Sequence, residues 1–569
     1  MFRFYSYICI EKHKNPTDMD GDYTKKSKAK PYDVIIIGGG ATGAGVARDC
    51  SRRGLSVLLL ERYDLATGAT GRNHGLLHSG ARYAVTDKES AEECIQENRI
   101  LRNIASHCIE DTQGLFISLP EDDLTYQDKF VQSCLSAGID AQVIDPKQAL
   151  LYEPSANKDL IGAVRVPDGA VDPFRLTLSN ILDAKAHGAE VLTYHEVVGV
   201  IKEQNRIIGV KAFDHKTKET KEIYGNITVN AGGIWGQHIS EFAGVKIKMF
   251  PAKGSLLIFG HRINKHVLNR CRKPGDADIL VPGDTICLIG TTSIHIDYDQ
   301  IDNMVVTPDE VDVLIREGEK LSPILAQTRI LRAYAGVRPL VAADDDPSGR
   351  NISRGIVLLD HAQRDGLEGY ITITGGKLMT YRLMAEMATD MVCKKLNVEA
   401  QCTTATEKLP GSRQTSEELK QKLISIPVSI RESMIYRHGD MAENVNENDT
   451  FARSLVCECE EVSVGEVEYA KEHLHVNNLV DLRRRTRVGM GTCQGALCAC
   501  RASGLMSQLK PTYTSAQSKE DLSHFLNERW KGVSPISWGD SLREGEYTSW
   551  VYRSVCGLTS PEKKKEYGI

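Results

Sequence analysis

The sequence predicts an α/β fold, α+β overall, in which a Rossmann-like dinucleotide-binding domain carries an antiparallel-sheet substrate cap and precedes a small cysteine-bearing domain. Three observations predict this arrangement. A buried strand near the start of the chain runs into a glycine-rich turn, two distant strands also end in glycines, and five of the 15 cysteines cluster in residues 457–500. The first two are typical of a nucleotide site assembled from separate segments, and the third is typical of a metal site.

The composition is that of a globular protein. The 569 residues are 41% hydrophobic and 26% charged, and the net charge of −6 gives no electrostatic reason to expect a nucleic-acid partner. At roughly 150 residues per domain, the length allows about three or four domains. No stretch reaches the ~18 apolar residues of a membrane-spanning helix. Residues 1–31 lack the apolar core and cleavage site of a secretory signal, so we expect a disordered N-terminal extension, with Met19 as an alternative start.

The first glycine-rich turn follows the β-branched run VIII, which predicts a buried strand. Gly38, Gly40 and Gly43 have the G-x-G-x-x-G spacing. The first glycine allows a tight turn, the second lets backbone N–H groups approach a pyrophosphate, and the third lets the next helix pack on the strand. That helix should end at Gly54. The strand after it ends on Glu61, whose carboxylate would accept hydrogen bonds from an adenosine ribose.

The segments that follow favour FAD over NAD. Residues 65–87 are rich in Gly, Thr and Ser, and two later strand-to-glycine turns lie in residues 227–236 and 370–396. Three separated turns suggest one extended ligand that is buried along its whole length, which suits FAD better than NAD; three unrelated loops are the alternative. The further residues that we expect to bind the cofactor are Arg62, Thr70, Gly232, Gly375 and Gly376.

The clustered cysteines have the pattern C-x-C, 33 intervening residues, then C-x-x-x-x-C. Without a secretory signal we expect a reducing compartment, no structural disulfides, and ten scattered cysteines that serve as buried hydrophobic residues. Zinc sites prefer C-x-x-C spacing, whereas four thiolates on two loops suit a [2Fe–2S] cluster; zinc and no metal remain as alternatives. The predicted ligands are Cys457, Cys459, Cys493 and Cys498.

The residues around these thiols support a small separate domain. Ser463 and Glu466 form an S-x-x-E capping box, which predicts a helix directly after the first cysteine pair. Cys500 has no place among four ligands, and we expect it in a structural position beside them. An oxidised four-thiolate centre carries a charge of about −2, which neighbouring cations could partly offset. Those cations are Arg483, Arg484, Arg485 and Arg487.

The chain resembles the FAD-dependent glycerol-3-phosphate dehydrogenases, within the D-amino-acid-oxidase-like flavoproteins. The segments that carry the resemblance are HGLLHSGARYAV, AYAGVRPLVAADDDPSGRNISRG and ITGGKLMTYRLMAE. The match runs from residue 32 to about residue 396. With the cysteine-bearing tail and FLNERWKG included, the chain is similar to the large (A) catalytic subunits of the anaerobic branch. The tail itself resembles a [2Fe–2S] domain of the bacterioferritin-associated-ferredoxin type.

The resemblance implies that sn-glycerol 3-phosphate is oxidised to dihydroxyacetone phosphate by hydride transfer to FAD. This substrate needs cations for its phosphate and a base for its hydroxyl proton. By resemblance, Arg338 is a catalytic residue near the reacting carbon and Arg354 is the candidate for the phosphate. His78 is the expected base, with an arginine-assisted or water route as the alternative, and His74 is expected to be structural. The other substrate-binding residues are Arg82, Tyr83 and Lys377.

The resemblance also implies partners. Two further subunits, a second flavoprotein-like one and an Fe–S membrane-anchoring one, would carry electrons to a quinone in anaerobic respiration. FMN is a candidate for an additional flavin of the complex. The chain would then be peripheral at the cytoplasmic face of the bacterial inner membrane. Two rival functions remain: an FAD/Fe–S dehydrogenase of an amine or amino acid, and a non-catalytic redox relay.

The expected domain organisation combines these segments. The oxidoreductase domain spans residues 32–400, and a helical linker and a C-terminal segment flank the [2Fe–2S] domain. The expected bounds are 32–104, 166–249 and 351–400 for the FAD-binding parts, 105–165 and 250–350 for the cap, 401–450 for the linker, 451–510 for the [2Fe–2S] domain and 511–569 for the last segment.

Overall fold

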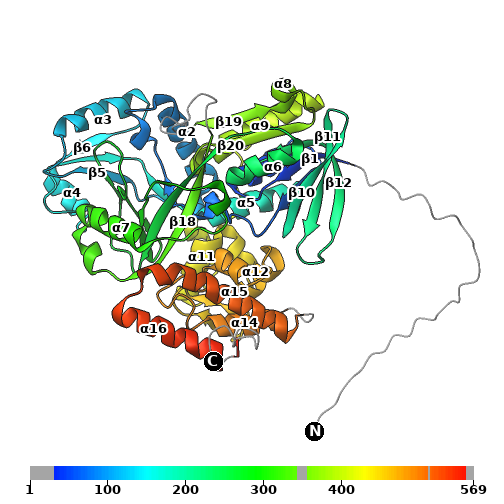
Figure 1. Cartoon of the computed structure of the whole chain (residues 1–569). Coiled ribbons are helices and arrows are strands. Elements are labelled where there is room, and N and C mark those ends of the chain that lie inside the picture. Colours follow the sequence, from blue (N-terminus) through cyan, green and yellow to red (C-terminus); the bar gives the residue numbers. More distant parts are fainter. Residues whose placement is uncertain (1–30, 342–354, 510–512, 556, 559–569) are drawn as a thin grey trace, which may run out of the picture.

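The computed structural model describes residues 31–341, 355–509, 513–555 and 557–558 (Figure 1). Its first sheet has eight strands, and the strands at its centre run parallel in the order β20-β12-β1-β2-β9. Two antiparallel additions complete the sheet: one strand pairs with β20, and a hairpin pairs with the first part of β12. The parallel strands are β1 (Tyr32–Ile37), β2 (Val57–Glu61), β9 (Glu190–Thr193), β12 (Thr220–Asn230) and β20 (Tyr370–Gly375), and the others are β10 (His195–Glu203), β11 (Arg206–Asp214) and β19 (Ile356–Asp360).

Helices and a hairpin cover the two faces of this sheet. Along β1, Val34 and Ile36 pack into one hydrophobic cluster with three helices, whereas Ile35 and Ile37 pack into another with β10, β11 and α6 (Gly236–Ala243). Both faces are therefore buried, as in parallel sheets generally. The three helices are α1 (Ala41–Arg52), α5 (Pro173–Ala186) and α9 (Tyr381–Leu396). The predicted Rossmann-like α/β class is confirmed.

The second sheet, of nine strands, forms the predicted cap. Every ladder in it is antiparallel except the pair β5 and β14, which runs parallel, so the cap is a mixed sheet rather than a purely antiparallel one. It joins two segments that are distant in sequence. The first supplies β5 (Gly114–Ser118), β6 (Gln142–Ile144) and β7 (Gly162–Val166), and the second supplies β13 (Met249–Phe259), β14 (Val267–Arg270), β15 (Ile279–Gly283), β16 (Ile286–Gly290), β17 (Ile294–His295) and β18 (Ile330–Val341).

The remainder of the chain is mainly helical and lies below both sheets in Figure 1. Its hydrophobic side chains join the cluster that covers β1, so residues from Val34 to Phe525 form one continuous core. Val445, inside the predicted linker, is 7% exposed and belongs to this core, so the segment is packed against the protein. The helices include α11 (Val428–His438), α12 (Val464–His473), α13 (Leu479–Thr486), α14 (Ala499–Gln508), α15 (Ser515–Val533) and α16 (Gly539–Trp550).

The predicted capping box of α12 is only half present. Ser463 accepts a hydrogen bond from the Glu466 N–H at 3.1 Å, as expected of an N-cap. The Glu466 carboxylate instead accepts hydrogen bonds from Arg437 at 2.6 and 2.7 Å and from His438 at 2.8 Å. These cations lower the pKa of Glu466 to about 2 in spite of its burial. The acid therefore ties α12 to α11 rather than capping its own helix.

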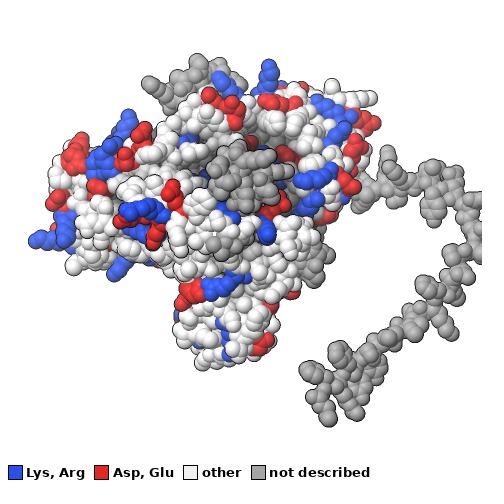
Figure 2. All heavy atoms as spheres, turned by 60° about the horizontal axis from the view of Figure 1, so that its bottom comes forward, with Lys and Arg blue, Asp and Glu red and all other residues white. Residues whose placement is uncertain are grey.

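Charged side chains of both signs are interspersed over the face that Figure 2 presents. No helix in the described ranges is long and apolar enough to cross a membrane.

Candidate active site

A cavity of about 520 Å³ opens where β1, β2, β12 and β20 end, between the two sheets. Eight of the nine residues predicted to bind a cofactor line it. They are Gly38, Gly40, Glu61, Arg62, Thr70, Gly232, Gly375 and Gly376. The ninth, Gly43, lies behind the turn. The structure thus brings together three glycine-bearing turns that are far apart in the sequence.

The first turn needs its glycines for steric reasons. Gly38 has φ +110°, and a Cβ there would lie 2.7 Å from the carbonyl oxygen of Ala231. A Cβ on Gly43 would lie 1.9 Å from the carbonyl oxygen of Gly38, so this glycine allows α1 to pack against the turn. Thr70 accepts a hydrogen bond from the Ala41 N–H at 3.0 Å. This bond anchors the loop of residues 65–87 at the start of α1.

Glu61 and Arg62 lie at the end of β2. The Glu61 carboxylate accepts hydrogen bonds from the N–H groups of Gly39 at 2.6 Å and Tyr63 at 2.9 Å, while burial raises its pKa. Arg62 lies 5.1 Å from the Trp235 ring centroid and donates to Asp302 at 2.8 Å. Its charge is therefore already paired at the margin of the cavity.

Three predicted substrate-site residues meet inside the cavity. The Lys377 ammonium lies 4.6 Å from the centroid of the Tyr83 ring, and the rings of Tyr83 and His78 are 5.6 Å apart. His78 itself is 8% exposed. Within the described ranges, the buried Lys377 Nζ has no hydrogen-bond partner. A buried ammonium in this state is suited to an anionic ligand.

The turn that carries Lys377 uses two of its own N–H groups internally. The Gly376 N–H donates to the carbonyl of Gly355, and the Lys377 N–H donates to the Thr380 hydroxyl, both at 3.0 Å. The Lys377 side chain remains available to a ligand. A short 3-10 turn, Leu378–Thr380, separates it from α9.

Two predicted arginines differ in their surroundings. Arg338, on β18, lines the cavity and donates to the hydroxyl of Thr291 and, at 3.1 Å, to the carbonyl of Thr292. Arg82 does not line it: its guanidinium donates to Asp278 at 3.4 Å and to the Gly275 carbonyl at 3.2 Å. Arg82 therefore ties its loop to the cap, and its predicted contact with substrate stays a prediction. Arg354 lies outside the described residues.

His74 shows the features expected of a structural histidine. Its Nδ1 accepts a hydrogen bond from the Leu76 N–H at 3.2 Å. Burial, together with repulsion from Arg82 and Arg338, lowers its pKa to about 3. It is therefore neutral near pH 7.

The four predicted thiol ligands adjoin one another. Cys498 forms hydrogen bonds with Cys457 and with Cys493, which lowers the pKa of Cys457 to about 7 and of Cys493 to about 5, and raises that of Cys498. Cys459 adjoins Cys493. Backbone N–H groups also donate to these sulfurs, including those of Gly489 and Gly495. In the part of the chain that the structure describes, no three His, Cys, Asp or Glu side chains are arranged to hold a metal ion.

The surroundings of the thiols differ from the prediction. Arg484 and Arg485 pair with Asp64, at 2.9 Å for Arg484, instead of facing the sulfurs. The cations that do act on the thiols are Arg501, which also pairs with Glu458, and Arg529. Arg501 directly follows the last cysteine, which is a signal that the sequence contained. Nothing in the sequence pointed to Arg529.

The scattered cysteines within the described ranges follow expectation, whereas the structural position expected of Cys500 stays a prediction. Every cysteine within the described ranges is a free thiol. Cys500 is exposed. The scattered ones are mostly buried, as predicted for small hydrophobic residues.

Comparison with known proteins identifies the family. Residues 33–382 match the model of the FAD dependent oxidoreductase family. The chain is 67% identical over 526 residues to the A subunit of the anaerobic glycerol-3-phosphate dehydrogenase from Haemophilus influenzae, covering 92% of this chain and 93% of that protein. It is 66% identical to the protein of the same name from Escherichia coli K12, covering 95% and 99%. The chain belongs to the anaerobic glycerol-3-phosphate dehydrogenase A subunits, within the FAD-dependent oxidoreductases.

Two solved structures show the same fold as this chain. The glycerol-3-phosphate dehydrogenase of Bacillus halodurans, complexed with FAD, superposes with a TM-score of 0.70 at 24% identity and covers 90% of this chain and 97% of its own. Glycine oxidase from Bacillus cereus superposes with a TM-score of 0.52 at 20% identity, covering 65% and 98%. The oxidoreductase fold is thus shared with enzymes named for quite different substrates.

Proposed function

We propose that this chain oxidises sn-glycerol 3-phosphate to dihydroxyacetone phosphate with FAD as the hydride acceptor. The observation that carries the proposal is the buried Lys377 ammonium, which lacks a described hydrogen-bond partner and faces Tyr83 in the cavity. A phosphate dianion satisfies such a cation, whereas an amine substrate would add a second positive charge to it. The names of the relatives support the same substrate.

The residues around the cavity fit FAD. All six residues line the cavity: Gly38 and Gly40 would admit a pyrophosphate to the backbone, Glu61 would meet a ribose, and Gly232, Gly375 and Gly376 would allow close approach from two other strands. Bound FAD supplies the two-electron acceptor. Arg62 would then act on the adenosine side of FAD, and Thr70 would act at the loop of residues 65–87.

We assign roles in the chemistry to four residues. His78 takes the proton of the C2 hydroxyl, Arg338 stabilises the developing alkoxide, and Lys377 with Tyr83 orients the phosphate. These assignments rest on the position of all four residues in the lining of the same cavity. Arg354 is retained as a proposed phosphate contact.

The four adjoining thiols are proposed to hold a [2Fe–2S] cluster. Cys457, Cys459, Cys493 and Cys498 supply four sulfurs, and backbone N–H groups already donate to them, as is usual around such clusters. The glycines of this loop are required by close packing, because a Cβ on Gly495 would lie 2.6 Å from the Phe525 ring. When bound, the cluster accepts electrons one at a time.

Electrons are proposed to leave through partner subunits toward a membrane quinone. The relatives are named as one lettered component of a dehydrogenase, which supports assembly with other subunits. We propose two such partners, a second flavoprotein-like one and an Fe–S membrane-anchoring one, with this chain peripheral at the cytoplasmic face of the bacterial inner membrane. FMN is retained as a candidate flavin of that complex.

An anaerobic absorbance spectrum, with and without glycerol 3-phosphate, tests the proposed reaction. We expect flavin bleaching within seconds of mixing, and no bleaching with glycine, proline or other amino acids. Bleaching by an amino acid alone would transfer the assignment to an amine dehydrogenase. Flavin and cluster absorbance without bleaching by either substrate would indicate a redox relay.

A further inference from the structure

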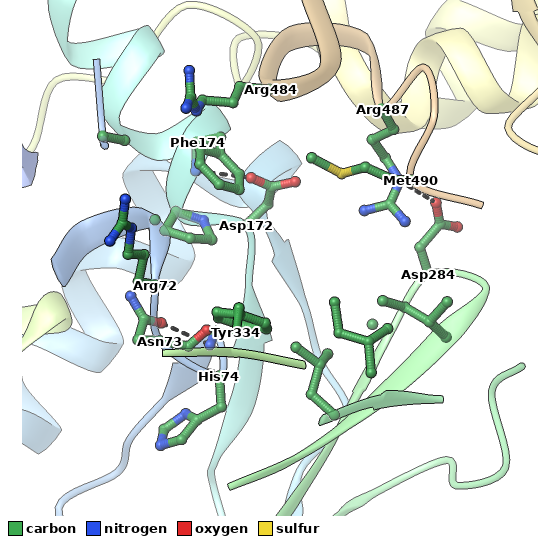
Figure 3. A pocket seen from close by; sticks show the side chains of 18 of the residues that line it. Arg72, Asn73, His74, Asp172, Phe174, Asp284, Tyr334, Arg484, Arg487 and Met490 are labelled. Atoms are coloured by element: carbon green, nitrogen blue, oxygen red, sulfur yellow. Dashed lines mark hydrogen bonds and ion pairs between the residues drawn. The ribbon is translucent and has the colours of Figure 1, made fainter. Parts of the chain in front are cut away.

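A second cavity, of about 270 Å³, lies between the oxidoreductase domain and the cysteine-bearing region. Residues 72–74 border both cavities, and Met490, three positions before Cys493, borders only the second. In Figure 3, Arg72 and His74 lie on one side of the opening, and Arg487 and Met490 lie on the other. The cavity therefore separates the proposed flavin site from the thiols.

Cations outnumber carboxylates in its lining. Four carboxylates line it, from Glu110, Asp172, Asp284 and Glu528, against seven cations. The cations are Arg72, Arg175, Arg332, Arg483, Arg484, Arg487 and Lys531.

Three of these arginines are neutralised by the protein. Arg175 pairs with Asp172 at 3.2 Å, Arg484 with Asp64 at 2.9 Å, and Arg487 with Glu460 at 2.7 Å. Arg487 also approaches Asp284 at 3.4 Å, the pair that Figure 3 marks. Even so, Nη2 of Arg175 and Nη2 of Arg487 are buried donors with no described acceptor. These two nitrogens can therefore still donate hydrogen bonds to a ligand in the cavity.

The other arginines have no such pairing. Arg72, Arg332 and Arg483 make no ion pair with any described carboxylate. Arg483 is only 8% exposed, and Nε of Arg332 is a further buried donor without an acceptor in the described part of the chain. Burial, reinforced by the neighbouring arginines, lowers the pKa of both Arg332 and Arg483. Glu528 is the carboxylate that opposes this repulsion. Burying unpaired cations is costly unless an anion neutralises them.

We propose that this cavity is a second anion site, which binds a small phosphate-bearing organic ligand distinct from the substrate. Phosphate is favoured over a carboxylate because the unpaired arginines come from three separate elements, the 72–74 loop, β18 and α13, and a tetrahedral anion offers oxygens to donors from several directions. The organic part is indicated by the apolar wall. That wall is formed by Phe174, Met304, Tyr334 and Met490.

The site is also connected to the first cavity. The Tyr334 hydroxyl, in the wall of the second cavity, donates to the carbonyl of Asn73 at 2.7 Å, and Asn73 lines both cavities. Occupation of the anion site is therefore expected to act on the loop that carries His74 and leads to His78.

Titration calorimetry of the FAD-loaded protein tests the proposal, with inorganic phosphate and phenyl phosphate as probes at constant ionic strength. The Lys377→Gln background weakens phosphate binding at the proposed substrate site, and a further change caused by a substitution in the second cavity reports that cavity. We expect Arg483→Gln to weaken phosphate binding about tenfold or more, and Glu528→Gln to strengthen it several-fold. Phenyl phosphate should bind more tightly than inorganic phosphate. Arg543→Gln, which changes an exposed arginine paired with Asp540, should leave the affinity unchanged.

Two further results bear on the outcome. In phosphate-free buffer, Arg483→Gln should unfold at the same or a higher temperature, because it removes repulsion between arginines. A lower midpoint would show that the protein itself neutralises Arg483, and would overturn the proposal. Unchanged phosphate affinity in Arg483→Gln and Glu528→Gln would also overturn it. Arg332→Gln is a second variant for the same comparison, and its phosphate affinity should fall in the same way.

Discussion

The Lys377 ammonium lies 4.6 Å from the centroid of the Tyr83 ring, although 294 positions separate the two residues in the chain. Tyr83 lies in the short 3-10 turn Ala81–Tyr83, within the loop of residues 65–87. Lys377 follows β20 at the end of the Rossmann-like sheet. The cation faces an aromatic ring, and its buried Nζ has no hydrogen-bond partner among the described residues. A cation in this position favours an anionic ligand.

Replacing Lys377 with glutamine should weaken use of glycerol 3-phosphate. Loss of one charge-assisted contact to phosphate is worth about 1.5–3 kcal/mol, or roughly 10- to 150-fold in kcat/KM. Stopped-flow measurement of flavin bleaching gives this change in kcat/KM. Lys395→Gln is the matched control, because Lys395 pairs with Asp360 at 2.8 Å and does not line the cavity. Equal kcat/KM values in the two variants would remove Lys377 from the site.

Replacing His78 with glutamine should slow flavin reduction by about 10²- to 10⁴-fold, the usual contribution of a general base. The acid limb of the pH profile should also disappear. His74 supplies no such limb above pH 5, because its pKa is lowered to about 3. His74→Gln should therefore keep the wild-type profile. An unaltered rate and profile in His78→Gln would assign proton removal to an arginine-assisted or water route.

Acid should destabilise the protein through His107. Burial lowers its pKa to about 3, and Arg175 and His438 add repulsion. Because the unfolded histidine titrates near 6.5, the unfolded state binds more protons between about pH 6.5 and pH 3, so stability falls as the pH drops through this window. From pH 7 to pH 5, this residue should account for about 2 kcal/mol.

Urea unfolding of His107→Gln at pH 7 and pH 5 isolates that contribution. The variant should be less stable at both pH values, because the ring lies 2.7 Å from the Ser412 hydroxyl. Its loss of stability between the two pH values should nevertheless be smaller than that of the wild type by about 2 kcal/mol. Identical losses would show that His107 is not the group that titrates.

Replacing Cys457 or Cys498 with serine should remove iron and its visible absorbance from protein purified without oxygen. Flavin content and the first anaerobic bleaching should remain, because the cavity for FAD does not include these thiols. Cys500→Ser is the matched control: its side chain is exposed, and we expect full iron content. Zinc in place of iron in the wild type would favour the alternative metal.

Much of the nucleotide site was predictable from the sequence because it depends on local geometry. Gly43 is required by a contact within one strand-turn-helix unit, Gly38 has a positive φ of +110°, and buried strands identify themselves by β-branched runs. The convergence of the four thiols was also predictable, since spacing and residue type restrict what such cysteines do. The mixed cap sheet was harder, because β5 and β14 pair across about 150 residues of chain.

The sequence by itself determined the fold class, the cofactor turn and the family resemblance. Only the tertiary structure decided which charges are neutralised. Arg82 pairs with Asp278, and Arg484 pairs with Asp64, partners 196 and 420 positions away. Arg483 has no described ion pair, is buried and lines the second cavity. A motif can name a cation, but its partner and its burial depend on segments that meet only in the folded chain, and these decide whether it binds a ligand or holds the protein together.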